Sequence, residues 1–140
     1  MQYRIQQTCD GIDWQAVYQL LQAVDMANRP VELMQKAFEN SYCTVFIFEG
    51  ESIVGCGRAI SDGVYQAGLY NIAVLPHYQG KNIGKLIVDA LHQQLQGMNV
   101  ILYARPGKEL FYHKLGYRRL LTGMARFVNE GRMREGGYID

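Results

Sequence analysis

A stretch rich in glycine and lysine, residues 79–85, carries the clearest chemical signal in the sequence. It reads Gln-Gly-Lys-Asn-Ile-Gly-Lys and stands between an apolar run and a segment whose apolar residues recur at helical spacing. The first four N–H groups of a helix lack internal partners, and the aligned peptide dipoles place partial positive charge there. Glycines at this point let a phosphate approach the backbone, and lysines add positive charge at the rim. The spacing therefore predicts a strand-to-helix turn that binds a pyrophosphate.

Two other phosphate-binding patterns do not fit the sequence. A P-loop requires Ser or Thr after its Gly-Lys pair, but Leu86 follows Gly84-Lys85. The dinucleotide fingerprint requires a third glycine that opens a helix, whereas Ile60 takes that position in the strand-like segment "GCGRAI". We expect the two glycines of that segment, Gly55 and Gly57, to relieve crowding or to form a bulge.

Apolar periodicity and turn signals predict the elements that must position the turn. We expect helices at 14–24, capped by Asp13, at 31–38, with Pro30 in the first turn, at 83–95 and at 108–116, closed by Gly116. We expect strands at 3–7, 42–49, 52–60, 67–75, 100–104, 117–121 and 123–128. Short turn-prone segments join several of these strands as hairpins.

The order of the middle elements determines the fold class. A strand at 67–75, a helix of about four turns and a strand at 100–104 form a crossover, so the two strands are parallel and the connection is right-handed. The hairpins before and after this crossover are antiparallel. We therefore expect an α/β fold of the α+β type with three layers, in which helices cover both faces of a mixed sheet with antiparallel N-terminal strands. The length fits a single domain, residues 1–140.

Composition and charge exclude several classes of function. Hydrophobic residues make up 49% and charged residues 19% of the chain, which is typical of a globular protein. Because 14 Lys and Arg nearly balance 13 Asp and Glu, the net charge of +1 predicts neither a nucleic-acid nor a membrane partner. The three cysteines form no Cys-x-x-Cys pair, and we expect reduced thiols in a cytoplasmic protein. His77, His92 and His113 lack metal-ligand spacing, so we expect no metal site.

Two motifs together resemble those of the GCN5-related N-acetyltransferase (GNAT) family. The segment "NIAVLPHYQGKNIGKLIVDAL" resembles its acetyl-CoA-binding motif, Gln/Arg-x-x-Gly-x-Gly/Ala, and "ELFYHKLGYRR" resembles its later aromatic motif. They stand in the family's order and cover roughly residues 69–119. Asn82 replaces the first signature glycine, and Asn tolerates a left-handed backbone well. The resemblance implies the acyl-CoA N-acyltransferase fold in a small, single-domain member of bacterial type.

The resemblance also implies where acetyl-CoA binds. The pyrophosphate would be held, mainly by backbone N–H groups, at Gln79, Gly80, Lys81, Asn82, Ile83, Gly84 and Lys85. The pantetheine arm would lie like an extra strand along Ile72, Ala73 and Val74, where two parallel strands separate. Solvated lysines on a helix face are the alternative interpretation of Lys81 and Lys85.

Tyr112 corresponds to the tyrosine that faces the thioester sulfur in this family. A phenol of pKa about 10 would donate its proton uphill by about 2 kcal/mol to a thiolate whose acid has a pKa of about 8.5. We therefore expect Tyr112 to act as a hydrogen-bond donor to the leaving thiolate. The alternative is an aromatic side chain that merely packs beside Phe111.

The resemblance places the amine acceptor against the two early helices and their connection. Asn28 and Arg29 are therefore candidate acceptor-binding residues, and Arg29 suits a carboxylate or phosphate. Many relatives carry an acidic residue on the strand before the turn, where this sequence offers Tyr70 and Asn71. We expect an ordered water held by these groups or by backbone carbonyls to take the proton of the amine. The outside candidates for a general base are Asp62 and Glu109.

These expectations predict an acetyl-CoA-dependent N-acetyltransferase that transfers the acetyl group directly to a primary amine. The acceptor, a small molecule or a peptide, stays open. A non-catalytic CoA- or acyl-CoA-binding module is the main alternative, favoured by Asn82 and by the missing acidic base. A nucleic-acid or protein adaptor is disfavoured by the near-zero net charge. We expect a homodimer, formed through sheet edges or by exchange of the glycine-rich C-terminal tail.

Overall fold

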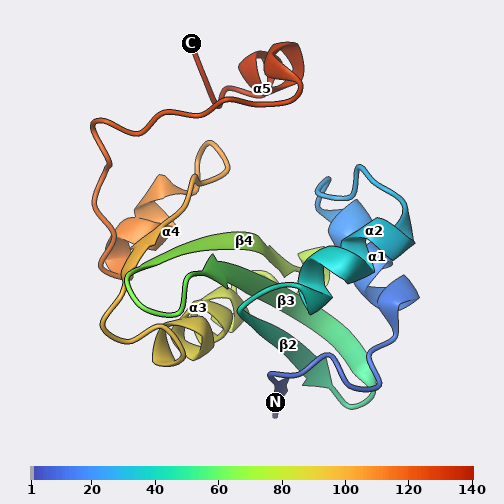
Figure 1. The fold of residues 1–140 in the computed structure, drawn as a ribbon. Coiled ribbons are helices and arrows are strands. Elements are labelled where there is room, and N and C mark those ends of the chain that lie inside the picture. The colour runs from blue at the N-terminus through green and yellow to red at the C-terminus, as the bar shows by residue number, and fades with distance from the viewer. Residues whose placement is uncertain (1) are drawn as a thin grey trace. The chain divides into compact units, whose positions relative to one another are not determined.

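The computed structural model describes residues 2–140, which form two compact units, one ending at Leu102 and the other running from Tyr103 to Asp140. Figure 1 shows the course of the chain. The first unit contains β1 (Arg4–Gln6), α1 (Trp14–Ala23), α2 (Val31–Glu39), β2 (Cys43–Glu49), β3 (Ser52–Ser61), β4 (Gln66–Val74), the 3-10 turn η1 (Pro76–Tyr78), α3 (Ile83–Gln93) and β5 (Asn99–Ile101). The second contains α4 (Glu109–Lys114) and α5 (Glu130–Glu135).

The first unit is built on a mixed sheet with the strand order β1-β2-β3-β4-β5. β1 to β4 pair antiparallel, whereas β4 and β5 are parallel and are joined through α3. Figure 1 shows α3 on one side of this sheet and α1 with α2 on the other. The predicted three-layer arrangement, with its antiparallel N-terminal strands and its parallel pair around a crossover helix, is confirmed.

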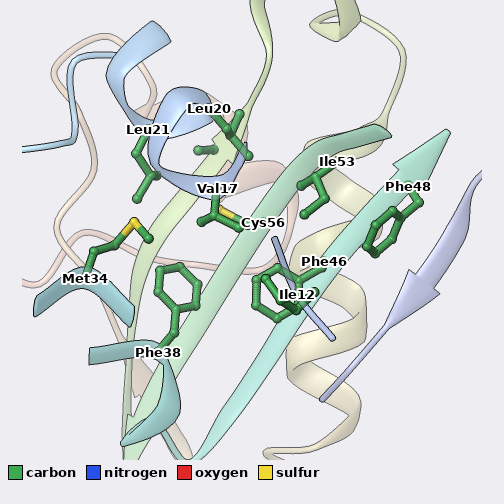
Figure 2. Close-up of a cluster of buried hydrophobic side chains, with 11 residues drawn as sticks. Ile12, Val17, Leu20, Leu21, Met34, Phe38, Phe46, Phe48, Ile53 and Cys56 are labelled. Atoms are coloured by element: carbon green, nitrogen blue, oxygen red, sulfur yellow. The ribbon is translucent and has the colours of Figure 1, made fainter. Parts of the chain in front are cut away.

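One face of the sheet carries an aromatic core beneath α1 and α2. Trp14, Phe38 and Phe46 pack with ring centroids 5.6–5.9 Å apart. Val17 of α1 and Cys56 of β3 are fully buried in the same cluster, which Figure 2 shows between the helices and the strands. Burial of each large apolar side chain contributes about 1.5–3 kcal/mol. The α1–α2 pair is thus held firmly on the sheet.

The opposite face brings α3 into close contact with β3 at two glycines. A Cβ on Gly57 would lie 2.7 Å from Ile87 Cγ2 of α3 and 2.8 Å from Ile72 Cδ1 of β4. One on Gly55 would lie 3.0 Å from Ile87 Cδ1. Both side-chain positions must therefore stay empty for the helix to approach. This close packing holds the N-terminal end of α3, where the predicted phosphate turn begins, against the sheet.

A bulge interrupts the pairing of β3 with β4. Cys56 pairs with Ala73 and Arg58 pairs with Tyr70, so two β4 residues, 71 and 72, stand opposite Gly57 alone. A bulge of this kind bends the strand and increases its twist. The expectation that the glycines of the "GCGRAI" segment relieve crowding is confirmed at Gly57, whereas the bulge itself lies in β4, opposite Gly57.

The second unit differs from the sequence-based expectation. α4 and its closing Gly116, at φ 99°, agree with the prediction. The strands predicted at 117–121 and 123–128 are wrong, because no residue of Tyr103–Asp140, all of them described, belongs to a strand. Apolar and β-branched residues favour a strand only beside a pairing partner, and none is present within this unit. The tail instead forms the unexpected α5, whose cap Asn129 accepts a hydrogen bond from Arg132 N at 3.0 Å.

Smaller differences concern the ends of elements. Pro30 lies just before α2 as its cap residue, not in the first helical position. β5 ends at Ile101, three residues earlier than expected, and α3 ends at Gln93. Asp13 caps α1 as predicted, through a bond from Ala16 N to its Oδ1 at 3.2 Å.

Candidate functional site

The turn at residues 79–82 connects the end of β4, through η1, to the start of α3. Gly80 and Asn82 both adopt left-handed backbone conformations, with φ 80° and 65°. A Cβ on Gly80 would meet nothing within 4 Å, so the backbone faces open space there. Asn82 is exposed and its side chain makes no capping hydrogen bond. The turn thus presents main chain to solvent.

The start of α3 offers backbone donors at this turn. The first helical hydrogen bond runs from Leu86 N to Asn82 O, at 3.1 Å. The N–H groups of Ile83, Gly84 and Lys85 therefore precede the hydrogen-bonded part of the helix. They lie at the positive end of the helix dipole, which attracts an anion.

Side chains anchor the turn and set its charge. Gln79 Nε2 donates to the carbonyl of Val74 at 3.0 Å and so ties the turn back to the end of β4. Lys81 Nζ lies 5.4 Å from the centroid of the Tyr78 ring. Lys85 Nζ lies 2.6 Å from Asp89 Oδ2 in an exposed ion pair, which points its charge along the helix. Gln79 therefore has a positioning role, Lys81 stands beside the turn, and Lys85 is paired with Asp89.

Beyond its first three residues, β4 has an edge that β5 does not pair. β5 pairs only with Gln66, Ala67 and Gly68. Residues 69–74 of β4 continue toward the turn, and on the other edge they pair with β3. The part that contains Ile72, Ala73 and Val74 thus combines a ladder with β3 on one side with an edge that β5 does not pair on the other, an arrangement suited to an extended ligand that adds as a strand.

The bulge in β4 is locked by a side-chain contact. Asn71 has a left-handed backbone, at φ 55°. Its Oδ1 accepts a hydrogen bond from Arg58 Nε at 2.7 Å, and its carbonyl accepts one from Cys56 Sγ at 3.5 Å. Arg58 in turn lies 5.4 Å from the Tyr70 ring centroid. Asn71, which directly precedes Ile72 on the open edge, is therefore held from two sides.

A cavity of about 460 Å³ lies beside this bulge, bounded by α1, α2, their connection and the sheet. Three of the predicted acceptor residues line it together: Asn28, Arg29 and Asn71. Tyr70 is not among its lining residues, although its ring lies beside Arg58. The volume falls in the range of small-molecule sites, roughly 300–1,000 Å³.

Sequence reasoning missed Arg58 and Lys36, which also line this cavity. The position of Lys36 on α2 carries no distinctive signal. Arg58 does, because it is the only charged residue in the otherwise small and apolar β3 segment 53–60. A charged residue within such a strand must find polar partners or line a cavity.

Tyr112 lies on α4 in the second unit. Its ring centroid is 4.9 Å from that of Phe111 and 5.7 Å from that of Tyr117. Burial raises the pKa of Tyr112 above its ordinary value. The phenol therefore stays protonated throughout the physiological range, where it can donate a hydrogen bond but is a poor proton donor.

The other candidate groups have structural tasks. The Asp62 carboxylate accepts hydrogen bonds from three backbone N–H groups of its turn, which lower its pKa and weaken it as a base. Glu109 accepts a bond from Gly107 N at 2.6 Å. Complete burial raises the pKa of Cys56 to about 12, so its thiol is not a ready nucleophile.

The described residues contain neither a metal-binding cluster nor a membrane-spanning helix. Within 2–140, no three His, Cys, Asp or Glu side chains gather in a group able to hold a metal ion. No helix in that range combines the length and the apolar character needed to cross a membrane.

Comparison with known proteins points to one family. The family model of the GNAT acetyltransferase domain matches residues 40–119. The uncharacterized N-acetyltransferase ycf52 of Pyropia yezoensis is 28% identical over 133 residues, which span 81% of this chain and 76% of that protein. The ycf52-like N-acetyltransferase of Prochlorococcus marinus is 32% identical over 106 residues, 71% of this chain but only 59% of its own length. The chain thus spans about three fifths to three quarters of these relatives.

A solved structure supports the fold. The structure of the GNAT-family acetyltransferase of Streptococcus pneumoniae superposes on this chain with a TM-score of 0.78. The match covers 92% of this chain and 99% of the Streptococcus pneumoniae chain. At 24% sequence identity, this likeness confirms the expected acyltransferase fold.

Proposed function

The chain belongs to the GNAT acetyltransferase family, and from that premise we propose that it transfers the acetyl group of acetyl-CoA directly to a primary amine. The observation that carries this proposal is the continuity of two features. The open edge of β4 at residues 69–74 leads directly into the turn whose backbone donors lie at the start of α3. A ligand with an extended arm and a diphosphate matches both, and acetyl-CoA has both parts.

In this proposal the chain's main-chain groups do most of the binding. N–H groups at Ile83, Gly84 and Lys85, together with the turn at 79–82, hold the pyrophosphate. The open groups of β4 near Ile72 to Val74 hold the arm, and one of these N–H groups polarises the thioester carbonyl. The same donor stabilises the oxyanion that forms when the amine attacks. Both substrates are thereby held in attacking geometry without a covalent enzyme intermediate.

Tyr112 acts in this proposal as a hydrogen-bond donor to the departing thiolate. Its raised pKa fits that task, because a phenol that resists ionisation keeps its hydrogen to donate. The proton that the chain must remove is the one on the amine. An alkylammonium of pKa about 10.4 costs about 4.6 kcal/mol to deprotonate at pH 7. We assign the exit of this proton to an ordered water held near Tyr70 and Asn71 or by backbone carbonyls.

The acceptor enters from the cavity beside the bulge. Asn28, Arg29 and Asn71 line that cavity, and Asn71 directly precedes Ile72 on the open edge of β4. An amine bound there lies next to the strand that we propose for the thioester. The family match at 40–119 includes residues of both compact units, which supports our proposal that residues 1–140 act as one acetyltransferase domain.

We also propose that the protein works as a cytoplasmic homodimer. Leu121, Met124 and Val128 of the second unit are 83–97% exposed, and a second copy is a suitable partner for such side chains.

A CoA-binding module without transfer activity is the second candidate, because Asn82 occupies a signature position and no acidic side chain stands at Tyr70 or Asn71. The two functions differ in one observable. Acetyl transfer releases free CoA thiol only when an amine is present, whereas a binding module releases none.

The test is thiol release from acetyl-CoA with a panel of primary amines, for wild type and for Tyr112→Phe. We expect amine-dependent release by the wild type and a loss of more than about tenfold in kcat in the variant, with little change in CoA affinity. The wild-type rate should keep rising with pH up to about pH 10, because the amine loses its proton while Tyr112 keeps its own.

Tyr138→Phe, the same change elsewhere in the second unit, serves as the control and should keep wild-type kinetics. Wild-type kinetics in Tyr112→Phe would assign Tyr112 a packing role only. Absence of thiol release with every amine, in a protein that still binds CoA, would favour the binding module.

A further inference from the structure

The cavity beside the β4 bulge concentrates positive charge. Arg29, Lys36 and Arg58 line it, and no Asp or Glu is found among its described lining residues. The whole chain has a net charge of only +1, so this accumulation is local. A cavity lined by charges of one sign raises the local concentration of ligands of the opposite sign.

Arg58 is the cation that the fold holds most firmly. Its Nε donates to Asn71 Oδ1 at 2.7 Å and its Nη1 to Ser41 Oγ at 3.4 Å. Its guanidinium lies 5.7 Å from the Phe38 ring centroid and 5.4 Å from that of Tyr70. The acceptors in these two bonds are neutral side-chain oxygens, and the bonds orient the guanidinium. A half-buried, oriented guanidinium is well suited to bind a planar oxyanion.

The position of Arg58 relates this charge to the proposed chemistry. Its partner Asn71 immediately precedes Ile72, where the open edge of β4 offers main-chain groups for the thioester. Consecutive Cα atoms are about 3.8 Å apart, and Arg58 contacts the side chain of Asn71, so in the proposed chemistry an anion on Arg58 is close to an amine at that edge. The cavity, at about 460 Å³, has the volume for an acceptor the size of an amino acid.

We infer that the acceptor is a small amine that carries a carboxylate a few bonds from its amino group, and that Arg58 binds this carboxylate. The inference rests on the proposed acetyltransferase function and adds the substrate class. Arg29 and Lys36 supply further positive charge around the same cavity. In contrast, a polyamine or another purely cationic acceptor is repelled from this cavity.

Matched acceptors test the inference. Acetyl transfer is measured with ω-amino acids of increasing chain length, with the primary amide of each, and with phosphoethanolamine. We expect kcat/KM for the best carboxylate to exceed that for its amide by about 10- to 100-fold, the range of a charge-assisted hydrogen bond pair. Phosphoethanolamine separates a requirement for carboxylate from a requirement for any anion, and a preference for it over every carboxylate overturns the assignment of a carboxylate.

Arg58→Met should reduce the preference for carboxylate over amide to about one, and Arg58→Lys should keep part of it. The control is Arg4→Met, because Arg4 also lies over an aromatic ring, 4.1 Å from the centroid of Phe48, but does not line the cavity. It should keep the wild-type preference. The ratio is the decisive readout, because a guanidinium that only braces Asn71 would affect acid and amide equally and leave their ratio unchanged.

The outcomes separate this inference from the proposed function. Amines acetylated with no preference for carboxylates would overturn the inference and leave the function standing. An unchanged preference in Arg58→Met and Arg58→Lys would also overturn the role of Arg58. Failure of every amine would overturn both. If Arg58→Met does not fold, the wild-type preference and the Arg58→Lys ratio still decide the question.

Discussion

Two asparagines with left-handed backbones, Asn71 and Asn82, flank the proposed acetyl-CoA site and are held in opposite ways. Asn71 lies in the β4 bulge at φ 55°, half-buried, with its side chain bonded to Arg58 at 2.7 Å. Asn82 lies at the start of α3 at φ 65°, exposed and without a capping bond. Both use the tolerance of Asn for this conformation, but only at Asn71 does the side chain also fix the structure.

This difference separates two kinds of site. We call the turn at 79–82 the backbone device, because in the proposed site its N–H groups bind the ligand and no side chain blocks them. We call the β4 bulge the side-chain device, because there the side chains of Arg58 and Asn71 fix the strand next to the proposed thioester and acceptor positions. We therefore expect glycine to replace asparagine at little cost in the turn and at a larger cost in the bulge.

The largest expected effect comes from blocking the backbone device. Gly84→Glu places bulk and negative charge among the N–H donors at the start of α3, and should weaken CoA binding by more than about 100-fold. The helix should still form, because a carboxylate near its N-terminus complements the dipole. Binding is measured by calorimetry with CoA.

Gln93→Glu is the matched control, since it adds the same charge at the exposed far end of α3. Its CoA affinity should stay close to that of the wild type. Unchanged affinity in Gly84→Glu would show that the pyrophosphate binds elsewhere.

A smaller effect distinguishes the two asparagines directly. Asn71→Gly removes the bond to Arg58 and should lower the free energy of unfolding by about 1–2 kcal/mol and acetyl transfer by about tenfold. Asn82→Gly should change the free energy of unfolding by less than about 0.5 kcal/mol and CoA affinity by less than about threefold. The entropic cost of adding a glycine is common to both variants and cancels in the comparison. Chemical denaturation and CoA titration measure the pair, and equal effects at the two positions would refute the distinction.

Local sequence signals predicted the backbone device well. Glycine and lysine spacing, a preceding strand and a following apolar stripe are all encoded within a few residues of the turn, and α3 does begin at Ile83. The crossover order predicted the parallel β4–β5 pair for the same reason. The β2–β3 and β3–β4 pairs followed from hairpin turns, such as the one at Asp62, whose carboxylate caps three N–H groups.

The side-chain device could not be predicted, because it depends on contacts between distant segments. Arg58 and Asn71 meet across the β3–β4 pair, and the register shift that creates the bulge leaves no local pattern in the sequence. The strand prediction for the tail was wrong for a related reason. Segments 117–121 and 123–128 have strand-like composition, but pairing decides whether a strand forms, and pairing is not a local property.

The most direct test of the account is a calorimetric titration of the wild-type protein with CoA at low and high ionic strength. We predict saturable binding with a Kd well below about 1 mM, weakened as salt screens the phosphates from the start of α3. A folded protein that gives no heat of binding with CoA or acetyl-CoA at millimolar concentration would contradict the central claim that the turn at 79–85 holds a pyrophosphate.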